Sequence, residues 1–162
     1  MSVVVSDTSP LHYLILCGAE EILPKLFQQV IIPTTVFAEL QQSNTPLAVK
    51  QWTNALPDWI AVQSPKHLQT GLDVDRGELE AISLAQEIHA IAVLMDDLAG
   101  RRAAAQCGLA VVGTLGLIEE ASIRDLIDLP RVIGQFQKTN ARLDSKLIEA
   151  VLERHHARTK KA

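Results

Sequence analysis

Residues 91–97, Ile-Ala-Val-Leu-Met-Asp-Asp, join a strongly apolar run to two acids at its carboxyl end. A short run of this kind is typical of a strand buried on both faces, as in a parallel sheet covered by helices. Ligands of such sheets bind beyond the carboxyl ends of the strands. The stretch therefore predicts a buried strand, with Asp96 and Asp97 at the edge where a site would lie.

Short apolar strands alternate with amphipathic helices on both sides of this stretch. This alternation predicts an α/β fold, a three-layer sandwich with a central, mainly parallel sheet. Helix caps are expected at Ser9, at Thr34 or Thr35, and at Asp75, and Gly18 is expected to end the first helix. The further strands are expected at residues 3–5, 30–32, 60–62 and 111–112.

The chain has 162 residues, of which 48% are hydrophobic and 21% charged, as in one globular domain of ordinary size. We expect residues 1–125 to form the α/β domain and residues 126–162 to form a helical extension packed on it. The last 40 residues are expected to be helical throughout. The apolar face of the final helix is assigned to Leu143, Leu147, Ile148, Val151 and Leu152.

No apolar run approaches the roughly 20 residues that a membrane-spanning helix needs. The first residues, Met-Ser-Val-Val-Val-Ser-Asp, lack the basic start of a signal peptide. Cys17 and Cys107 are far apart, so buried thiols are expected rather than a disulfide or a metal site. We expect a cytoplasmic protein without a membrane partner.

The net charge of −4 argues at first sight against a nucleic-acid partner. Its distribution is uneven, because residues 1–137 hold 8 basic against 16 acidic residues, whereas residues 138–162 hold 7 against 3. The acids of the larger part therefore need an explanation of their own.

Four separate elements are placed to bring carboxylates to the same edge of the sheet. Asp7 ends the first strand, Glu39 lies in the helix after the second strand, and Glu78 lies in the first turn of a later helix. With Asp96 and Asp97 they make five candidate acids.

Several of these acids also have a structural interpretation. Asp7 could accept backbone N–H groups at its turn, and Glu78 could close a capping box with Asp75. Asp97 could pair with Arg101 one helical turn later.

Glu39 could likewise be an ordinary solvated helix position, and Glu80 is expected at the surface. The adjacent pair Asp96 and Asp97 favours function, because two neighbouring acids gain nothing structurally from repelling each other. A cluster of carboxylates is stable only with a compensating charge, and oxygen ligands select Mg²⁺ or Mn²⁺. Such ions activate water for phosphodiester cleavage.

These motifs resemble the PIN-domain family of metal-dependent ribonucleases, which includes VapC-like toxins of toxin-antitoxin modules. The resemblance covers about residues 3–120 and follows the order of the family motifs. The matching pieces are Val-Val-Val-Ser-Asp7-Thr-Ser-Pro-Leu, Val-Ile-Ile-Pro-Thr-Thr-Val-Phe-Ala-Glu39-Leu, Asp-Arg-Gly-Glu78-Leu-Glu-Ala-Ile-Ser-Leu-Ala, and Ala-Val-Leu-Met-Asp96-Asp97-Leu-Ala-Gly-Arg-Arg-Ala-Ala, together with Val-Val-Gly-Thr-Leu-Gly.

The resemblance implies catalytic and metal-binding roles for the acids. Asp7 would be the first metal ligand, supported by the Ser9 hydroxyl, and Glu39 would take the place of the family's helix glutamate. Glu78 falls where many members have an aspartate. Asp97 falls on the last acid, with Asp96 beside it as a further ligand.

Two departures, the glutamate at position 78 and Met95 where a threonine often stands, resemble a Gly-Glu-containing branch of PIN-like proteins. The resemblance implies an RNA substrate, Mg²⁺ or Mn²⁺ as cofactor, an antitoxin partner and a homodimer. Arg101 is a candidate phosphate contact, and the basic tail is a candidate RNA contact or a solvated terminus.

Two other functions remain open from the residues. One is a PIN-like module that has lost catalysis and only binds protein or RNA. The other is a phospho-receiver domain, which needs a lysine after a late strand, whereas residues 111–112 are followed by Gly113 and Thr114.

Overall fold

The computed structural model describes residues 2–161, and its strands form one parallel sheet in the order β3-β2-β1-β4-β5. All five strands expected from the sequence are present, so the mainly parallel sheet is confirmed. Because the strands are parallel, their carboxyl ends meet at a single edge. The strands are β1 (Val3–Ser6), β2 (Gln29–Ile32), β3 (Ile60–Val62), β4 (Ala92–Leu94) and β5 (Val111–Val112).

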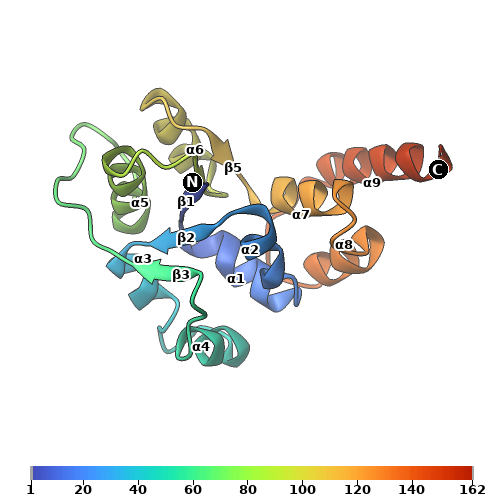
Figure 1. Ribbon diagram of the computed structural model, residues 1–162, viewed down its shortest axis with the longest axis horizontal. Coiled ribbons are helices and arrows are strands. Elements are labelled where there is room, and N and C mark those ends of the chain that lie inside the picture. Colours follow the sequence, from blue (N-terminus) through green and yellow to red (C-terminus); the bar gives the residue numbers. More distant parts are fainter. Residues whose placement is uncertain (1, 162) are drawn as a thin grey trace.

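Successive strand residues point into two different cores, as the two-residue period of a strand requires. Val5 and Val93 face α5 (Arg76–Glu87) and α6 (Leu98–Gln106). Val4 and Leu94 face the helices of the opposite layer. Figure 1 shows the two groups of helices on either side of the sheet. The three-layer α/β sandwich is therefore confirmed. The opposite layer contains α1 (Thr8–Leu16), α4 (Leu47–Thr53), α7 (Thr114–Ile123), α8 (Leu129–Gln137) and α9 (Ser145–Lys160).

Two expected helix caps are wrong, because the helices start directly where the strands end. Asp7, not Ser9, occupies the N-cap position of α1. Pro33 precedes α3 (Thr34–Glu39), and no side chain caps that helix. The ring of Pro33 sets its φ near −61°, so the chain turns into the helix one residue earlier than a threonine cap would allow. Gly18, with φ of +64°, follows the end of α1 as expected.

A short 3₁₀ turn, η1 (Glu20–Ile22), and the four-residue helix α2 (Leu23–Leu26) were not expected from the sequence. Neither is long enough to show an apolar period. They return the chain from α1 to the start of β2.

The last 40 residues are not helical throughout, because turns separate α7 from α8 and α8 from α9. The side chains of Asp128 and Asp144 cap α8 and α9, so each helix has its own start. Ile148 and Val151 are buried as expected. Leu147 was expected inside and is 58% exposed, because it borders a groove.

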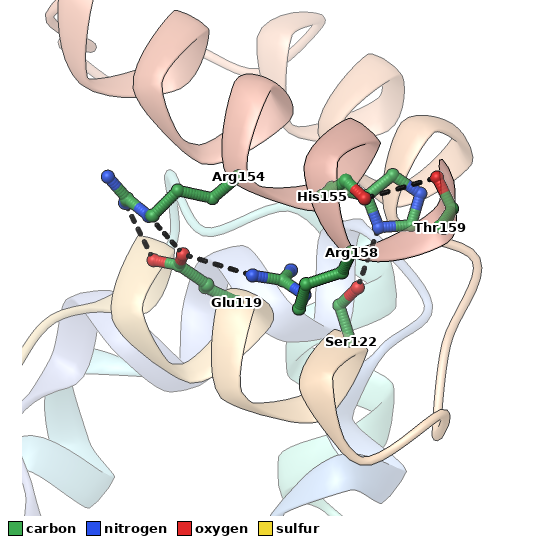
Figure 2. Close-up of polar contacts among 6 residues, drawn as sticks. All are labelled: Glu119, Ser122, Arg154, His155, Arg158 and Thr159. Atoms are coloured by element: carbon green, nitrogen blue, oxygen red, sulfur yellow. Dashed lines mark hydrogen bonds and ion pairs between the residues drawn. The ribbon is translucent and has the colours of Figure 1, made fainter. Parts of the chain in front are cut away.

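Polar contacts join α9 to α7 (Figure 2). Arg154 donates from Nε and Nη2 to the two carboxylate oxygens of Glu119, at 2.6 and 2.9 Å. Nη1 of Arg158 lies 3.9 Å from the same carboxylate, and Ser122 Oγ is 3.3 Å from His155 Nδ1. Two cations of the basic tail are thus engaged within the molecule.

The division into residues 1–125 and 126–162 stays a prediction, since α8 and α9 share the core of α1 and α7.

Across residues 2–161 there is no helix both long enough and apolar enough to cross a bilayer. Both cysteines are free thiols; Cys17 is buried as expected, whereas Cys107 is only half-buried.

Candidate active site

Asp7 lies at the carboxyl end of β1, in the middle of the sheet. Its side chain is only 7% exposed. Although Asp7 is the N-cap residue of α1, its carboxylate makes no capping hydrogen bond to that helix. Helix capping therefore does not account for this buried acid.

Glu39 is the last residue of α3 and lies beside Asp7. Its Oε2 accepts a hydrogen bond from the Thr8 hydroxyl. Gly77, near the start of α5, borders both acids, since a methyl group there would lie 3.0 Å from Glu39 Oε1 and 3.4 Å from Asp7 Oδ1. The absence of a side chain at Gly77 lets α5 close over this pair.

Glu78 is 5% exposed, and it serves both the helix and the acid cluster. The capping box with Asp75 is confirmed, because Glu78 N donates to Asp75 Oδ1 at 2.8 Å and Asp75 N donates to Glu78 Oε2 at 3.3 Å. The other oxygen, Oε1, would lie 3.2 Å from a methyl group at Gly100. Asp97 lies near enough to Glu78 to raise the pKa of the Glu78 carboxyl.

Asp96 and Asp97 both have structural partners, so the expectation that neighbouring acids gain nothing structurally is wrong. Both oxygens of Asp96 accept hydrogen bonds from Thr114, at 2.7 Å from the backbone N and 2.6 Å from Oγ1. Asp97 caps α6, accepting from Gly100 N at 3.2 Å. Asp96 thus stabilises the start of α7. Asp97 is exposed, and its second carboxylate oxygen stays free to face Glu78.

Arg101 does not form an ion pair with Asp97 in the part of the chain that the structure describes. Its Nη1 donates instead to the carbonyl of Met95, at 2.9 Å. Ser9 makes no hydrogen bond to Asp7 within residues 2–161, and the neighbouring Thr8 supports Glu39 instead. The supporting role of Ser9 stays a prediction.

Two of the clustered carboxyls have strongly raised pKa values. The pKa of Asp7 is raised to about 7, chiefly by burial. The charges of Asp75, Glu78 and Glu39 also raise this pKa, whereas a backbone contact with Thr8 lowers it. Burial likewise raises the pKa of Glu78 to about 7, with Asp75 and then Asp97 as the acidic neighbours that contribute. The cluster therefore resists carrying its full negative charge alone.

Within residues 2–161, no three or more acidic, histidine or cysteine side chains are placed to hold a metal ion as they stand. The acids lie instead as two neighbouring pairs, Asp7 with Glu39 and Glu78 with Asp97. The donors are carboxylate oxygens, which suit Mg²⁺ or Mn²⁺. A cation would also relieve the repulsion that raises the two pKa values. In chemistry and in charge, the residues fit a hard divalent cation.

Two hollows flank the acids. A polar cavity of about 590 Å³ is lined by Thr8 and Glu39 among others. A groove of about 890 Å³ is lined by Asp96 and Asp97 and by residues of α9. Asn140, which precedes α9, lines both hollows.

Glu80 was expected at the surface and is instead 6% exposed, with an ion pair of 3.7 Å to Arg76. The helical period places it beside the buried face of α5.

Thr8 and Thr114 were not expected from the sequence as partners of the acids. Thr8 adjoins Asp7 in the sequence, whereas Thr114 lies 18 residues from Asp96, so only the fold brings that pair together.

The parallel sheet, its helical layers and the acids at its carboxyl edge define an α/β domain of the PIN-like class. The chain belongs to the DUF3368 family of PIN domains, whose family model matches residues 3–157. PIN domains are generally nucleases that depend on divalent metals, which supports a hydrolase at a coarse level.

No significant match was found among curated proteins. Among solved structures, the chain is similar to a PilT N-terminus domain protein from the hyperthermophilic archaeon Sulfolobus solfataricus P2. The identity is 16% and the TM-score 0.48, over 88% of this chain and 99% of that one.

Proposed function

We propose that this chain is an endoribonuclease that hydrolyses RNA phosphodiesters with Mg²⁺ or Mn²⁺. The observation that carries the proposal is the burial of Asp7 and Glu78 together at the carboxyl edge of the sheet, each with a pKa near 7. Burying two acids side by side is costly, and such perturbed groups mark functional sites. The nuclease character of the family agrees with this interpretation.

In the proposed mechanism, Asp7, Glu39, Glu78 and Asp97 would hold the cation. When bound, it supplies a water of lowered pKa and balances the charge that develops on the phosphate. Hydrolysis forms one P–O bond from water and breaks another, and the leaving oxygen takes up a proton.

The surrounding residues orient this carboxylate set. Thr8 fixes the rotamer of Glu39, and Gly100 fixes that of Asp97. Asp96 acts as a positioning residue, because both of its oxygens are held by Thr114. Arg101 uses one nitrogen for Met95 and keeps its other donors for a phosphate at the groove.

The test is cleavage of a defined single-stranded RNA by the purified chain, with single-stranded DNA of the same sequence in parallel. We expect RNA cleavage with Mg²⁺ or Mn²⁺, none with EDTA, and weaker cleavage of DNA. Cleavage that persists in EDTA would contradict the metal requirement. Absence of cleavage of any RNA, under conditions where the chain is folded, would favour the PIN-like module that only binds.

We propose further that the chain is the cytoplasmic toxin of a toxin-antitoxin module and forms a homodimer. The support is the resemblance to VapC-like toxins and the family assignment. Expression of the chain should arrest bacterial growth, and co-expression of a small neighbouring reading frame should restore it. Unimpaired growth at high expression would contradict a toxin role. The phospho-receiver alternative has no support once the family is known.

A further inference from the structure

The cavity beside Glu39 has a lining unlike that of a phosphate site. Its lining includes three side-chain amides, those of Gln42 and Asn44, which follow α3, and that of Asn140. Among the described residues that line it there is no Lys or Arg. The one carboxylate in the wall, Glu39, would repel a phosphate, so an anion is a poor occupant.

The amide groups give this cavity its recognition chemistry. Gln42 and Asn44 are exposed, and neither side-chain amide makes a hydrogen bond within residues 2–161. Asn140 Oδ1 accepts only a long hydrogen bond, 3.4 Å, from the Tyr13 hydroxyl. Each amide offers both donors and an acceptor, the set that pairs with the edge of a base.

Flat and apolar surfaces complete the wall. The ring of His12 is half-buried on α1, and burial lowers its pKa, which favours the uncharged ring. Leu16 and Pro46 provide apolar contact beside it. Bases splayed out of single-stranded RNA are recognised by such a combination of stacking and edge hydrogen bonds.

The position of the cavity relates it to the acids. Glu39 and Thr8 belong both to the acid cluster and to the cavity wall. A neutral group bound here would lie next to a phosphate at the acids, as a base lies next to its own phosphate. The volume of about 590 Å³ is within the usual range for a small-ligand site.

We propose that this cavity is a nucleobase subsite, in which Gln42, Asn44 and Asn140 read the edge of one unpaired base beside the cleaved phosphodiester. The inference rests on the proposed function, because it names the part of the same substrate that confers specificity.

The experiment titrates the full chain, without metal, with AMP, CMP, GMP and UMP, and with ribose 5-phosphate as the base-free probe. Binding is followed by the NMR signals of the side-chain amide groups. At least one nucleotide is expected to bind about tenfold more tightly than ribose 5-phosphate, which corresponds to one good edge contact. The signals of Gln42, Asn44 and Asn140 should shift.

The double variant Gln42→Ala, Asn44→Ala should lose that tenfold preference. Gln106→Ala is the matched control, because Gln106 is an exposed amide at the end of α6 outside the cavity, and it should keep the preference. Nucleotides that bind no better than ribose 5-phosphate, or a preference that survives the double variant, would overturn the subsite.

The two proposals fail separately in these measurements. Base preference without RNA cleavage would contradict the nuclease function and keep the cavity as a base-binding site. RNA cleavage by the wild-type chain without any base preference would contradict the subsite alone.

Discussion

At the scale of single residues, two glycines determine how closely the helices approach the acids. Gly77 lies against Glu39 and Asp7, and Gly100 lies against Glu78 and Met95, where a methyl group would come within 2.6 Å of the methionine sulfur. Real side chains do not tolerate such an approach without a shift of their neighbours. Neither glycine has a positive φ, so the backbone conformation does not require glycine there. Glycine is needed at both positions because the helix passes so close to the neighbouring side chains.

Gly77→Ala should therefore displace Glu39 without unfolding the chain. We expect Mn²⁺ affinity and RNA cleavage to fall by about tenfold, in line with changes to groups that orient metal ligands. Gly134→Ala in α8 is the control, because a methyl group there meets nothing within 4 Å and favours the helix by up to about 1 kcal/mol. Equal Mn²⁺ affinity in wild type and Gly77→Ala would show that this contact does not matter.

The identity of the acids could be predicted from their positions, but their partners could not. Asp7, Glu78 and Asp97 follow strands or begin helices, which sequence patterns indicate. The hydrogen bond between Thr114 and Asp96, and that between Arg101 and a backbone carbonyl, depend on side-chain rotamers in the folded chain. A local pattern carries no information on contacts of that kind.

At the scale of elements, the start of α5 combines a helix cap with part of the acid cluster. Asp75 accepts from Glu78 N, and its charge also raises the pKa values of Asp7 and Glu78. One side chain thus stabilises the helix and adds to the repulsion that a cation would relieve.

Substitutions of Asp75 should separate these two effects. Asp75→Ala should lower the free energy of unfolding by about 1 kcal/mol at pH 7, the usual cost of a lost cap. Asp75→Asn keeps a good cap and removes the charge, so it should cost less than alanine. Urea denaturation of the metal-free variants measures both. An alanine variant as stable as the asparagine variant would contradict the capping role.

Elements with a clear pattern of apolar residues could be predicted from the sequence. Features that depend on tertiary packing could not. The strands lie within a residue of their expected positions because their apolar runs are short and bounded. The starts of α1 and α3 were misplaced, since the chain turns into these helices at Asp7 and Pro33, before the expected cap residues. Leu147 was misplaced because the groove that exposes it is formed by segments far apart in sequence.

At the scale of the whole molecule, the acidic balance of residues 1–137 is partly explained by the edge of the sheet. Asp7 and Glu78 have pKa values of about 7 in the folded chain, against ordinary values of 3.8 and 4.5. From about pH 4 to pH 7 the folded state therefore holds protons that the unfolded state releases. These two carboxyls therefore make the metal-free chain less stable as pH rises through this window.

The melting temperature of the metal-free chain should drop by at least about 3 °C between pH 5 and pH 8, the change that about 1 kcal/mol produces at this size. Asp7→Asn should show a smaller drop, because one of the two groups no longer titrates. Saturating Mn²⁺ at pH 8 should raise the melting temperature of the wild type. A melting temperature that rises from pH 5 to pH 8 without metal would contradict the raised pKa values.

Mn²⁺ binding, followed by electron paramagnetic resonance at pH 8, tests directly whether the acidic edge of the sheet holds a divalent cation. The wild type should bind Mn²⁺, and Asp7→Asn should bind at least tenfold more weakly. Asp58→Asn, at an exposed acid before β3, should bind as the wild type does. Equal Mn²⁺ affinity in the wild type and Asp7→Asn would contradict the account.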